Sequence, residues 1–312
     1  MSDARTAQVR VPASTSNLGA GFDCIGFAVD RWLSATAVAH DSPVLEGIQE
    51  LTLRREGTLA PLTLPARDDA LVTGFAAACA SRGRGLPARL ELRVHSEIPV
   101  SRGLGSSSAA LIAGASLANE TLELGLDRNA LAQLCAAIEG HPDNVGPALF
   151  GGAVMGVPTA GVESAPEWVF APIAVHPDLA FAFVVPPFLV ETATARSVLP
   201  REIPHRVAVR ATGKSAALAH GLVTGDAALL RIALDDVLHV PFRRHLIPGF
   251  DDVVRAALEA GAYGATLSGS GSTLLAVATQ DVIESVAATM RRRWSELGVE
   301  TESIVQRRAV TV

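Results

Sequence analysis

The sequence predicts an α+β fold of two domains. Three observations lead to this fold class: alternating apolar residues typical of a strand at Leu90–Val94, helical spacing at Asp69–Ser81, and no regular alternation of strands with helices. A length of 312 residues accommodates two domains of ordinary size. Because the texture of the chain changes near Val157–Pro166, we expect domains at 1–160 and 161–312.

The N-terminal half opens with a short strand. Val9–Val11 alternates, and we expect the strand to end at Pro12 because proline cannot donate a backbone hydrogen bond. A loop of small polar residues follows at Ala13–Asp23. The other elements expected in this half are a strand around Ser34–Ala39, helices at Asp69–Ser81, from the Gly105 region towards Glu120 and at Arg128–Glu139, the strand Leu90–Val94, and turns at Pro142, Gly146–Pro147 and Gly151–Gly152.

The C-terminal half begins with the apolar strand Leu179–Val185, which we expect to end at Pro186–Pro187. A glycine-rich turn inside Thr266–Val277 separates two apolar segments, and a further strand lies near Ser303–Val305. Helical spacing predicts five helices in this half, at Thr192–Val198, Arg206–Thr224, Ala227–Leu238, Phe250–Ala260 and Val282–Leu297.

Composition argues against several classes of function. Apolar residues make up 49% and charged residues 19%, which is typical of a globular protein. A formal net charge of −6 without a basic run argues against binding to nucleic acid or to an anionic membrane. We also expect no membrane span and no secretory signal. Cys24, Cys79 and Cys135 are far apart and form no CxxC pair, so we expect no disulfide framework, no zinc site and a cytosolic location.

Lysine occurs once, at Lys214, among 26 basic residues. The P-loop pattern GxxxxGK[ST] is absent from the sequence. Any phosphate group must therefore be neutralised by arginine, backbone N–H groups or a metal ion. Because Lys214 is far in sequence from the motifs described below, we expect it to take no part in phosphate binding.

The strongest signal for chemistry is the run of glycines and serines at Gly103–Ala110. Glycine permits positive φ angles and lets a ligand approach the backbone closely. The serines lie where a helix begins, and the free N–H groups and dipole of a helix N-terminus bind anions. The alternative, for this run taken alone, is a serine-capped helix after a glycine turn.

Two further segments support a ligand site. Ser268–Ser272 is a dense glycine–serine turn between apolar segments, which indicates that the backbone approaches another group closely; a plain hairpin loop is the alternative. Glu139 ends a helical segment and is a candidate Mg²⁺ ligand, because Mg²⁺ takes one or two protein oxygens together with substrate phosphates. A solvated surface position is the alternative for Glu139, and a structural role is the alternative for His141.

In this order, the segments resemble the GHMP kinase superfamily. Pro99–Ala110 matches its phosphate loop, Pro-x-x-x-Gly-Leu-Gly-Ser-Ser-x-Ala, and Gly264–Ser272 matches its C-terminal glycine motif. Within the superfamily the chain resembles the homoserine kinases, over about residues 9 to 277. Four segments carry this closer resemblance: Val11–Asp23, Glu139–Ala148, Thr192–Pro200 and Pro241–Gly249.

The resemblance implies an ATP-dependent and Mg²⁺-dependent kinase, a homodimer, that phosphorylates L-homoserine in threonine biosynthesis. It implies an N-terminal domain of ribosomal-protein-S5-like type with a left-handed βαβ crossover, and a ferredoxin-like C-terminal domain. The implied nucleotide contacts are Pro99, Arg102, Gly103, Leu104, Gly105, Ser106, Ser107, Ser108 and Ala109. The implied metal ligands are Ser107 and Glu139, which with Asn144 form the catalytic set. The implied substrate contacts are Asn17, Asp23, His141, Asn144, Thr192, Arg196, Arg243, Ser268 and Gly269.

The chemistry of a zwitterionic amino acid fits these roles. Arg196 and Arg243 suit its carboxylate, and Asp23 suits its ammonium group. Surface salt bridges are the alternative for both arginines. We expect Asn144 to orient the hydroxyl without a protein base, since an amide cannot take a proton at neutral pH; Asp143 is the competing base. We also expect Arg102 to assist phosphate binding.

The sequence departs from the family pattern at two places. Ser272 stands where many relatives have proline. Asp68–Val72 lacks an expected asparagine, which leaves the adenine contacts and the preference for ATP open. Two other functions are weighed: another GHMP kinase, such as one that acts on mevalonate, and a catalytically silent binding relative. The second usually requires loss of a metal ligand, and both Ser107 and Glu139 are present.

Overall fold

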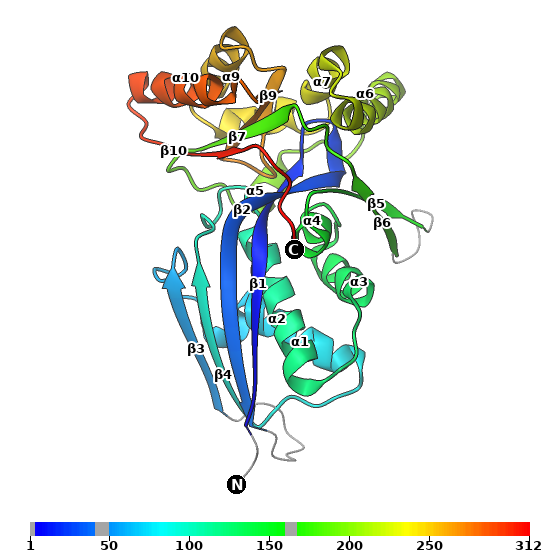
Figure 1. The fold of residues 1–312 in the computed structure, drawn as a ribbon, viewed down its shortest axis with the longest axis vertical. Coiled ribbons are helices and arrows are strands. Elements are labelled where there is room, and N and C mark those ends of the chain that lie inside the picture. The colour runs from blue at the N-terminus through cyan, green and yellow to red at the C-terminus, as the bar shows by residue number, and fades with distance from the viewer. Residues whose placement is uncertain (1–3, 41–49, 160–166) are drawn as a thin grey trace.

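The computed structural model describes residues 4–40, 50–159 and 167–312. Two sheets, each covered by helices, lie one above the other in Figure 1, and the long blue ribbon of the first two strands reaches from one region into the other. This arrangement confirms the predicted two-domain α+β fold. No helix in the described parts of the chain combines the length and apolar character needed to cross a bilayer.

The first sheet has six strands in the order β3-β4-β2-β5-β6, with β1 paired to β2. β3 and β4 are parallel and are joined through α1, which forms the expected βαβ unit, while the other pairs are antiparallel. The strands of this sheet are β1 (Ala4–Asn17), β2 (Gly21–His40), β3 (Glu50–Gly57), β4 (Arg89–Ser96), β5 (Ala153–Pro158) and β6 (Trp168–Ile173).

Two predictions for the N-terminal segment are wrong. β1 does not end at Pro12 but continues to Asn17, and the expected loop at Ala13–Asp23 is mostly strand. Because β1 pairs with no described strand except β2, Pro12 lies on an edge strand, where a missing N–H need not break the ladder. The chain accommodates it with a register shift between Pro12 and Ala13. The turn itself is confined to residues 18–20.

The second sheet has four strands in the order β10-β7-β9-β8, all antiparallel. Its strands are β7 (Leu179–Val185), β8 (Gly264–Leu267), β9 (Leu274–Thr279) and β10 (Glu302–Gln306). Helices separate β7 from β8 and β9 from β10, which gives the β-α-β-β-α-β connectivity of the expected ferredoxin-like domain. In Figure 1, α9 and α10 lie on the outer side of this sheet, next to the pair α6 and α7.

The helices agree with the prediction to within a few residues, apart from two regions. Gly146–Pro147 is not a turn but lies in the first turn of a short helix, where the N–H that proline lacks has no intrahelical partner. The helix expected to end at Leu238 ends at Leu234. The helices are α1 (Ala70–Ser81), α2 (Ser106–Leu122), α3 (Arg128–Glu139), α4 (Val145–Phe150), α5 (Thr192–Ser197), α6 (His205–Thr224), α7 (Ala227–Leu234), α8 (Val240–Arg243), α9 (Phe250–Glu259) and α10 (Ile283–Glu296), with 3-10 turns at Ala66–Asp68 and Arg244–Leu246.

The expected domain boundary at Val157–Pro166 lies partly outside the described residues. β5 and β6 flank this interval and pair with each other in the first sheet. The chain therefore passes from the first sheet to the second after Ile173, and the domain limits at residue 160 stay a prediction.

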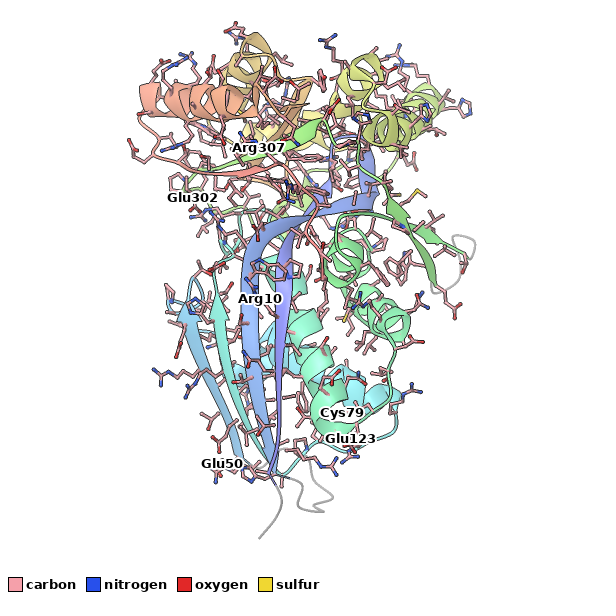
Figure 2. The ribbon with its side chains drawn as sticks, viewed as in Figure 1. Arg10, Glu50, Cys79, Glu123, Glu302 and Arg307 are labelled. Carbon is pink, nitrogen blue, oxygen red and sulfur yellow. The ribbon has the colours of Figure 1, made fainter. Side chains whose placement is uncertain are left out.

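Close packing of α1 on α2 fixes the helix that reaches the cleft. A Cβ atom at Gly114 would lie 1.8 Å from the carbonyl oxygen of Leu71, and one at Gly74 would lie 2.0 Å from that of Leu111. Neither helix could carry a side chain there without moving the other. Figure 2 labels Cys79 on α1 in this region, away from the second sheet. Cys79 is a free thiol, as are Cys24 and Cys135.

Candidate active site

A cleft of about 580 Å³ is lined by residues from both domains. It brings together predicted residues that are more than 200 positions apart in sequence, among them Asn17 and Arg243. The predicted site residues that line the cleft are Asn17, Asp23, Arg102, Gly103, Leu104, Gly105, Ser106, Ser107, Ser108, Glu139, His141, Asn144, Thr192, Arg196, Arg243 and Gly269. Pro99, Ala109 and Ser268 do not line it.

The N-terminus of α2 forms one wall of the cleft. Gly105 occupies the N-cap position with φ 66°, and no side chain in the described ranges caps the helix. The N–H groups of the first helical turn have no partner within the helix, so they are available to an anion. Ser106 and Ser107 are in this turn, at the positive end of the helix dipole.

The turn between β8 and β9 packs against this loop. A Cβ atom at Gly103 would lie 2.0 Å from the carbonyl oxygen of Ser268, and one at Gly105 would lie 2.2 Å from Ser14 Oγ. The Ser268 hydroxyl also lies 2.6 Å from the carbonyl oxygen of Gly103. The close approach predicted for Ser268–Ser272 is therefore confirmed, and the neighbouring group is the backbone of the glycine–serine loop.

Glu139 reaches the cleft from the end of α3. Its Oε2 accepts a hydrogen bond of 2.6 Å from the hydroxyl of Ser108. The predicted metal pair was Ser107 with Glu139; the hydroxyl that contacts Glu139 is that of Ser108, and Ser107 is exposed on the first turn of α2. Burial raises the pKa of Glu139, although the Ser108 hydrogen bond and the charge of His141 oppose this shift. Carboxylate and hydroxyl oxygens at this position fit Mg²⁺.

Two charge pairs occupy the opposite part of the cleft. Arg196 on α5 donates two hydrogen bonds to Asp23, of 2.9 and 3.2 Å. His141 Nδ1 lies 2.6 Å from Oδ1 of the buried Asp143. Asp23, His141 and Asp143 present ligand atoms within 4.8 Å of one another, so they could share a cation, but the Arg196 guanidinium already supplies a positive charge at Asp23.

Asn17 and Asn144 organise the backbone of the site. The Asn17 side chain donates to Gly269 O and accepts from the backbone N–H of Asp23, both at 3.0 Å, so it ties the two domains together. Asn144 Oδ1 accepts from the Ser14 hydroxyl at 3.0 Å, and a Cβ at Gly105 would lie 3.2 Å from the same oxygen. Asn144 therefore lies between the α2 N-terminus and the charged part of the cleft.

Arg243 is the most enclosed of the predicted arginines, with 2% of its surface exposed. Its Nε donates to Ala195 O at 3.0 Å, and its Nη1 lies 3.4 Å from both Gly269 O and His239 Nδ1. Burial lowers the pKa of Arg243, and the nearby Arg196 lowers it further. Two arginines held close together give the cleft a positive region that favours a carboxylate.

The remaining basic residues take other contacts. Arg102 lines the cleft, but its Nε donates to Pro186 O at 2.9 Å and its Nη1 to Val100 O at 3.5 Å, so it ties the two domains together. Lys214 binds Ile232 O, Asp235 O and the Asp235 carboxylate, away from the residues that line the cleft. This position of Lys214 agrees with the prediction that it takes no part in phosphate binding.

Sequence reasoning missed several residues of the cleft. Five apolar side chains and one threonine line one part of it, and no motif includes them: Leu59, Leu62, Leu64, Leu111, Ile138 and Thr73. Ser16 lines the cleft and Ser14 contacts Asn144; both are inside the opening motif, but their burial in a strand could not be read from it. His239 does not line the cleft but contacts Arg243, and no motif includes it.

Comparison with known proteins agrees with this geometry. The model of the GHMP kinases N terminal domain matches residues 70–152, and that of the GHMP kinases C terminal domain matches residues 218–296. A homoserine kinase from Picosynechococcus sp. is 36% identical over 94% of this chain and 93% of its own length. The crystal structure of homoserine kinase from Cytophaga hutchinsonii is 29% identical and superposes with a TM-score of 0.83, over 96% of this chain and 94% of that one.

More distant structures share the fold alone. The crystal structure of L. major mevalonate kinase in complex with R-mevalonate is 16% identical, with a TM-score of 0.70 over 97% of this chain and 98% of that one. The identity is more than twice as high for the homoserine kinase from Picosynechococcus sp.. With two family models matched in order and relatives at this identity along nearly the whole chain, the protein belongs to the homoserine kinases of the GHMP kinase superfamily.

Proposed function

We propose that the protein transfers the γ-phosphoryl group of ATP to the hydroxyl of L-homoserine, forming ADP, O-phospho-L-homoserine and a proton, as a step of threonine biosynthesis. The observation that carries this proposal is one cleft with an uncapped helix N-terminus on one side and the group Asp23, Arg196 and Arg243 on the other. The first suits a polyphosphate and the second suits a zwitterion.

The charge pair between Asp23 and Arg196 fits the two ends of an amino acid. Homoserine carries an ammonium and a carboxylate on the same carbon, so it can insert between the two side chains and replace their mutual contact. The carboxylates of Asp23 and Asp143 attract the ammonium group and offset the charge of His141 beside them, while Arg196 and Arg243 bind the substrate carboxylate. The contact of 2.9 Å between Arg196 and Asp23 keeps both groups in place before the substrate arrives.

The nucleotide lies with its triphosphate against the first turn of α2 and its base among the apolar residues of the cleft. Glu139, with Ser107 or Ser108, would hold Mg²⁺, whose charge would offset that of the triphosphate. Arg102 lines the cleft, and although carbonyl groups of Pro186 and Val100 hold its Nε and Nη1, its positive charge lies beside the phosphate loop and assists phosphate binding. Together with this arginine, backbone N–H groups do the work that lysine does in other nucleotide sites.

Asn144 orients the homoserine hydroxyl for in-line attack. The Ser14 hydroxyl donates a hydrogen bond to the amide oxygen of Asn144. The amide nitrogen, Nδ2, therefore remains to donate to the substrate oxygen. The hydroxyl proton leaves to the phosphate or to water as the new P–O bond forms and the bond to ADP breaks. Asp143 is held by His141 and buried, so we assign it a positioning role.

The oligomeric state and location of the protein stay expectations. We expect a cytosolic homodimer that does not bind nucleic acid, on the basis of the family resemblance and the net charge of −6. Light scattering during size-exclusion chromatography measures the mass in solution, and a monomer at working concentration would contradict the dimer.

A substrate series tests the proposed reaction. ATP consumption is measured with L-homoserine, with 4-hydroxybutanoate, which lacks the ammonium group, with 3-aminopropan-1-ol, which lacks the carboxylate, and with mevalonate, shikimate and galactose. We expect kcat/KM for each truncated alcohol to be at least about 100-fold below that for homoserine, because buried charged groups are left unpaired. Faster use of mevalonate, shikimate or galactose would overturn the assignment.

Neighbouring arginines provide a matched test of the substrate side. We expect Arg243→Lys to raise KM for homoserine by roughly 10- to 100-fold, because lysine cannot reproduce the planar fork of donors. KM for ATP should change less than about twofold. The control is Arg244→Lys, since Arg244 is exposed and pairs with Asp251. Equal effects of the two substitutions would argue against a carboxylate site at Arg243.

A further inference from the structure

A buried polar cluster lies behind Arg243. His239 precedes α8 and is fully buried, and Asp236 is 5% exposed. Phe22 stacks on the His239 ring at 5.0 Å between centroids, and the Arg243 guanidinium lies 5.3 Å from the Phe22 ring. Polar groups buried this deeply are costly unless each has a partner.

The side chain of Asp236 binds backbone N–H groups at the beginning of α8. Its carboxylate accepts hydrogen bonds from the N–H groups of Leu238, His239 and Val240, of 2.6 to 3.0 Å. This cap ends α7 early and turns the chain so that the imidazole of His239 points at the β1–β2 turn. Asp236 Oδ2 lies 3.7 Å from His239 Nε2, too far for a hydrogen bond.

The two neighbours of His239 determine where its proton lies. Nε2 is 3.2 Å from the carbonyl oxygen of Gly19, and Nδ1 is 3.4 Å from Nη1 of Arg243. A carbonyl oxygen can only accept a hydrogen bond and a guanidinium can only donate. His239 is therefore neutral, with its proton on Nε2 and a lone pair on Nδ1 directed at Arg243. Burial lowers the pKa of His239, which agrees with a neutral ring.

The carbonyl of Gly19 is itself held in place. Ala20 N donates to Ala233 O at 3.0 Å, and a Cβ at Gly19 would lie 2.8 Å from that same oxygen. The β1–β2 turn is thus docked against the end of α7, and Asp23 follows this turn in sequence. His239 therefore links the N-terminal segment that carries Asp23 to the C-terminal helix that carries Arg243.

We propose that His239 is a positioning residue, which accepts a hydrogen bond from Arg243 at Nδ1 and so holds its guanidinium in the orientation that binds the substrate carboxylate. Ala195 O fixes Nε and His239 fixes Nη1. Among the residues that the structure describes, Nη2 has no hydrogen-bond partner, so it remains for the ligand. The identity of the ligand, a carboxylate of homoserine, rests on the proposed function. The contact between His239 and Arg243 does not.

Three substitutions separate the two contacts of the ring. In His239→Asn the amide oxygen can replace Nδ1 as the acceptor for Arg243, while the donor to Gly19 is lost. In His239→Gln the amide can reach Gly19 but not Arg243. In His239→Phe both contacts are lost, whereas the aromatic ring and its stacking on Phe22 are kept. His245→Asn, on the exposed turn two residues after Arg243, is the control.

We expect His239→Phe and His239→Gln to raise KM for L-homoserine about tenfold, as expected from loss of one hydrogen bond to a charged group, with KM for ATP changed less than about twofold. His239→Asn should bring KM back to within about threefold of the wild type. For 3-aminopropan-1-ol, which has no carboxylate, KM should not change. A thermal unfolding curve for each variant reports on stability separately. If His239→Asn and His239→Phe raise KM for L-homoserine equally, the ring has only a structural role. The same conclusion follows if either variant also raises KM for 3-aminopropan-1-ol.

Nitrogen NMR of the histidine-labelled and arginine-labelled protein tests the contact without any substrate. We expect a proton on Nε2 of His239, and distinct Nη signals for Arg243 in the wild type and in His239→Asn that merge in His239→Phe. A proton on Nδ1, or Arg243 signals that do not change in His239→Phe, would overturn the proposal. If this result holds but homoserine is not phosphorylated, the proposed function alone has failed.

Discussion

The two sides of the cleft are built by different means. The nucleotide side is a continuous run of residues around Gly103 and Gly105, and its binding groups are mainly backbone N–H groups and a helix dipole. The opposite side is made of side chains from both domains, and each charged group there already has a partner, as in the contacts of Asp23 with Arg196 and of His141 with Asp143.

This difference determines which kind of substitution disrupts binding on each side. A backbone site depends on the shape of the loop, so it is disrupted by added atoms rather than by lost charge. A side-chain site depends on pairs, so removal of one member leaves the other buried and unpaired. The nucleotide side should therefore be sensitive to glycine substitutions, while the charged side should be sensitive to the loss of one member of a charge pair.

The largest expected effect is that of Gly103→Ala. The new Cβ would lie 2.0 Å from the carbonyl oxygen of Ser268, at a φ of 75° that alanine adopts poorly, so the loop or the β8–β9 turn must move. We expect kcat/KM to fall at least about 100-fold, since a shift of about 1 Å at a positioned phosphate has such an effect.

Gly125→Ala is the matched control for this substitution. Gly125 has a φ of 67°, but a Cβ there would meet no atom of the described residues within 4 Å. It reproduces the backbone strain without the collision, so it should cost about 1–2 kcal/mol of stability and leave kcat/KM unchanged. If both variants lost activity to the same degree, strain alone would explain the result and the comparison of the two sides would fail.

Asn144 lies where the two sides meet, so its substitution tests whether either side supplies a base. We expect Asn144→Ala to lower kcat about tenfold, through loss of one hydrogen bond to the hydroxyl. Asp143→Asn keeps the shape of the side chain but cannot accept a proton, and it should lower kcat by less than about tenfold. A general base would contribute ~10²–10⁴, so a loss in that range for Asp143→Asn, with a mild effect of Asn144→Ala, would make Asp143 the base.

The same difference explains what the sequence could predict. The glycine–serine loop could be located from its pattern, because a backbone site leaves a continuous signature in the chain. The resemblance named Asp23, His141, Arg196 and Arg243, but it could not predict that Asp23 pairs with Arg196 or that Ser108 contacts Glu139. Those contacts depend on how distant segments pack.

Errors in the predicted elements have the same physical origin. The sequence predicts an end of β1 at Pro12 because the rule for proline concerns a strand with neighbours on both sides, and the sequence does not reveal that β1 has one neighbour among the described strands. α7 ends at Leu234 because the Asp236 carboxylate binds three backbone N–H groups that follow it in sequence. The helical spacing of apolar residues cannot predict this contact. Tertiary contacts decided both cases.

The smallest expected effect concerns pH and the pair of His141 with Asp143. Burial lowers the pKa of His141, but the hydrogen bond to Asp143 and the charges of Asp143, Glu139 and Asp23 outweigh it, so the pKa is raised above its ordinary value of 6.5. A group whose pKa is raised by folding stabilises the folded protein while it is protonated. This contribution is complete below about pH 6.5 and is lost as the pH rises through the higher pKa of the folded protein.

We therefore expect His141→Asn to lower the free energy of unfolding by about 1–3 kcal/mol at pH 6, and by less as the pH is raised towards 9. Urea unfolding at a series of pH values measures this difference, and the exposed His220→Asn on α6 serves as the control. Gly103→Ala should show no such pH dependence, because the nucleotide side contains no paired histidine among the described residues that line it. A difference for His141→Asn that grows with pH would mean that the imidazole is neutral in the folded protein, and that the charged side is organised by hydrogen bonds rather than by ion pairs.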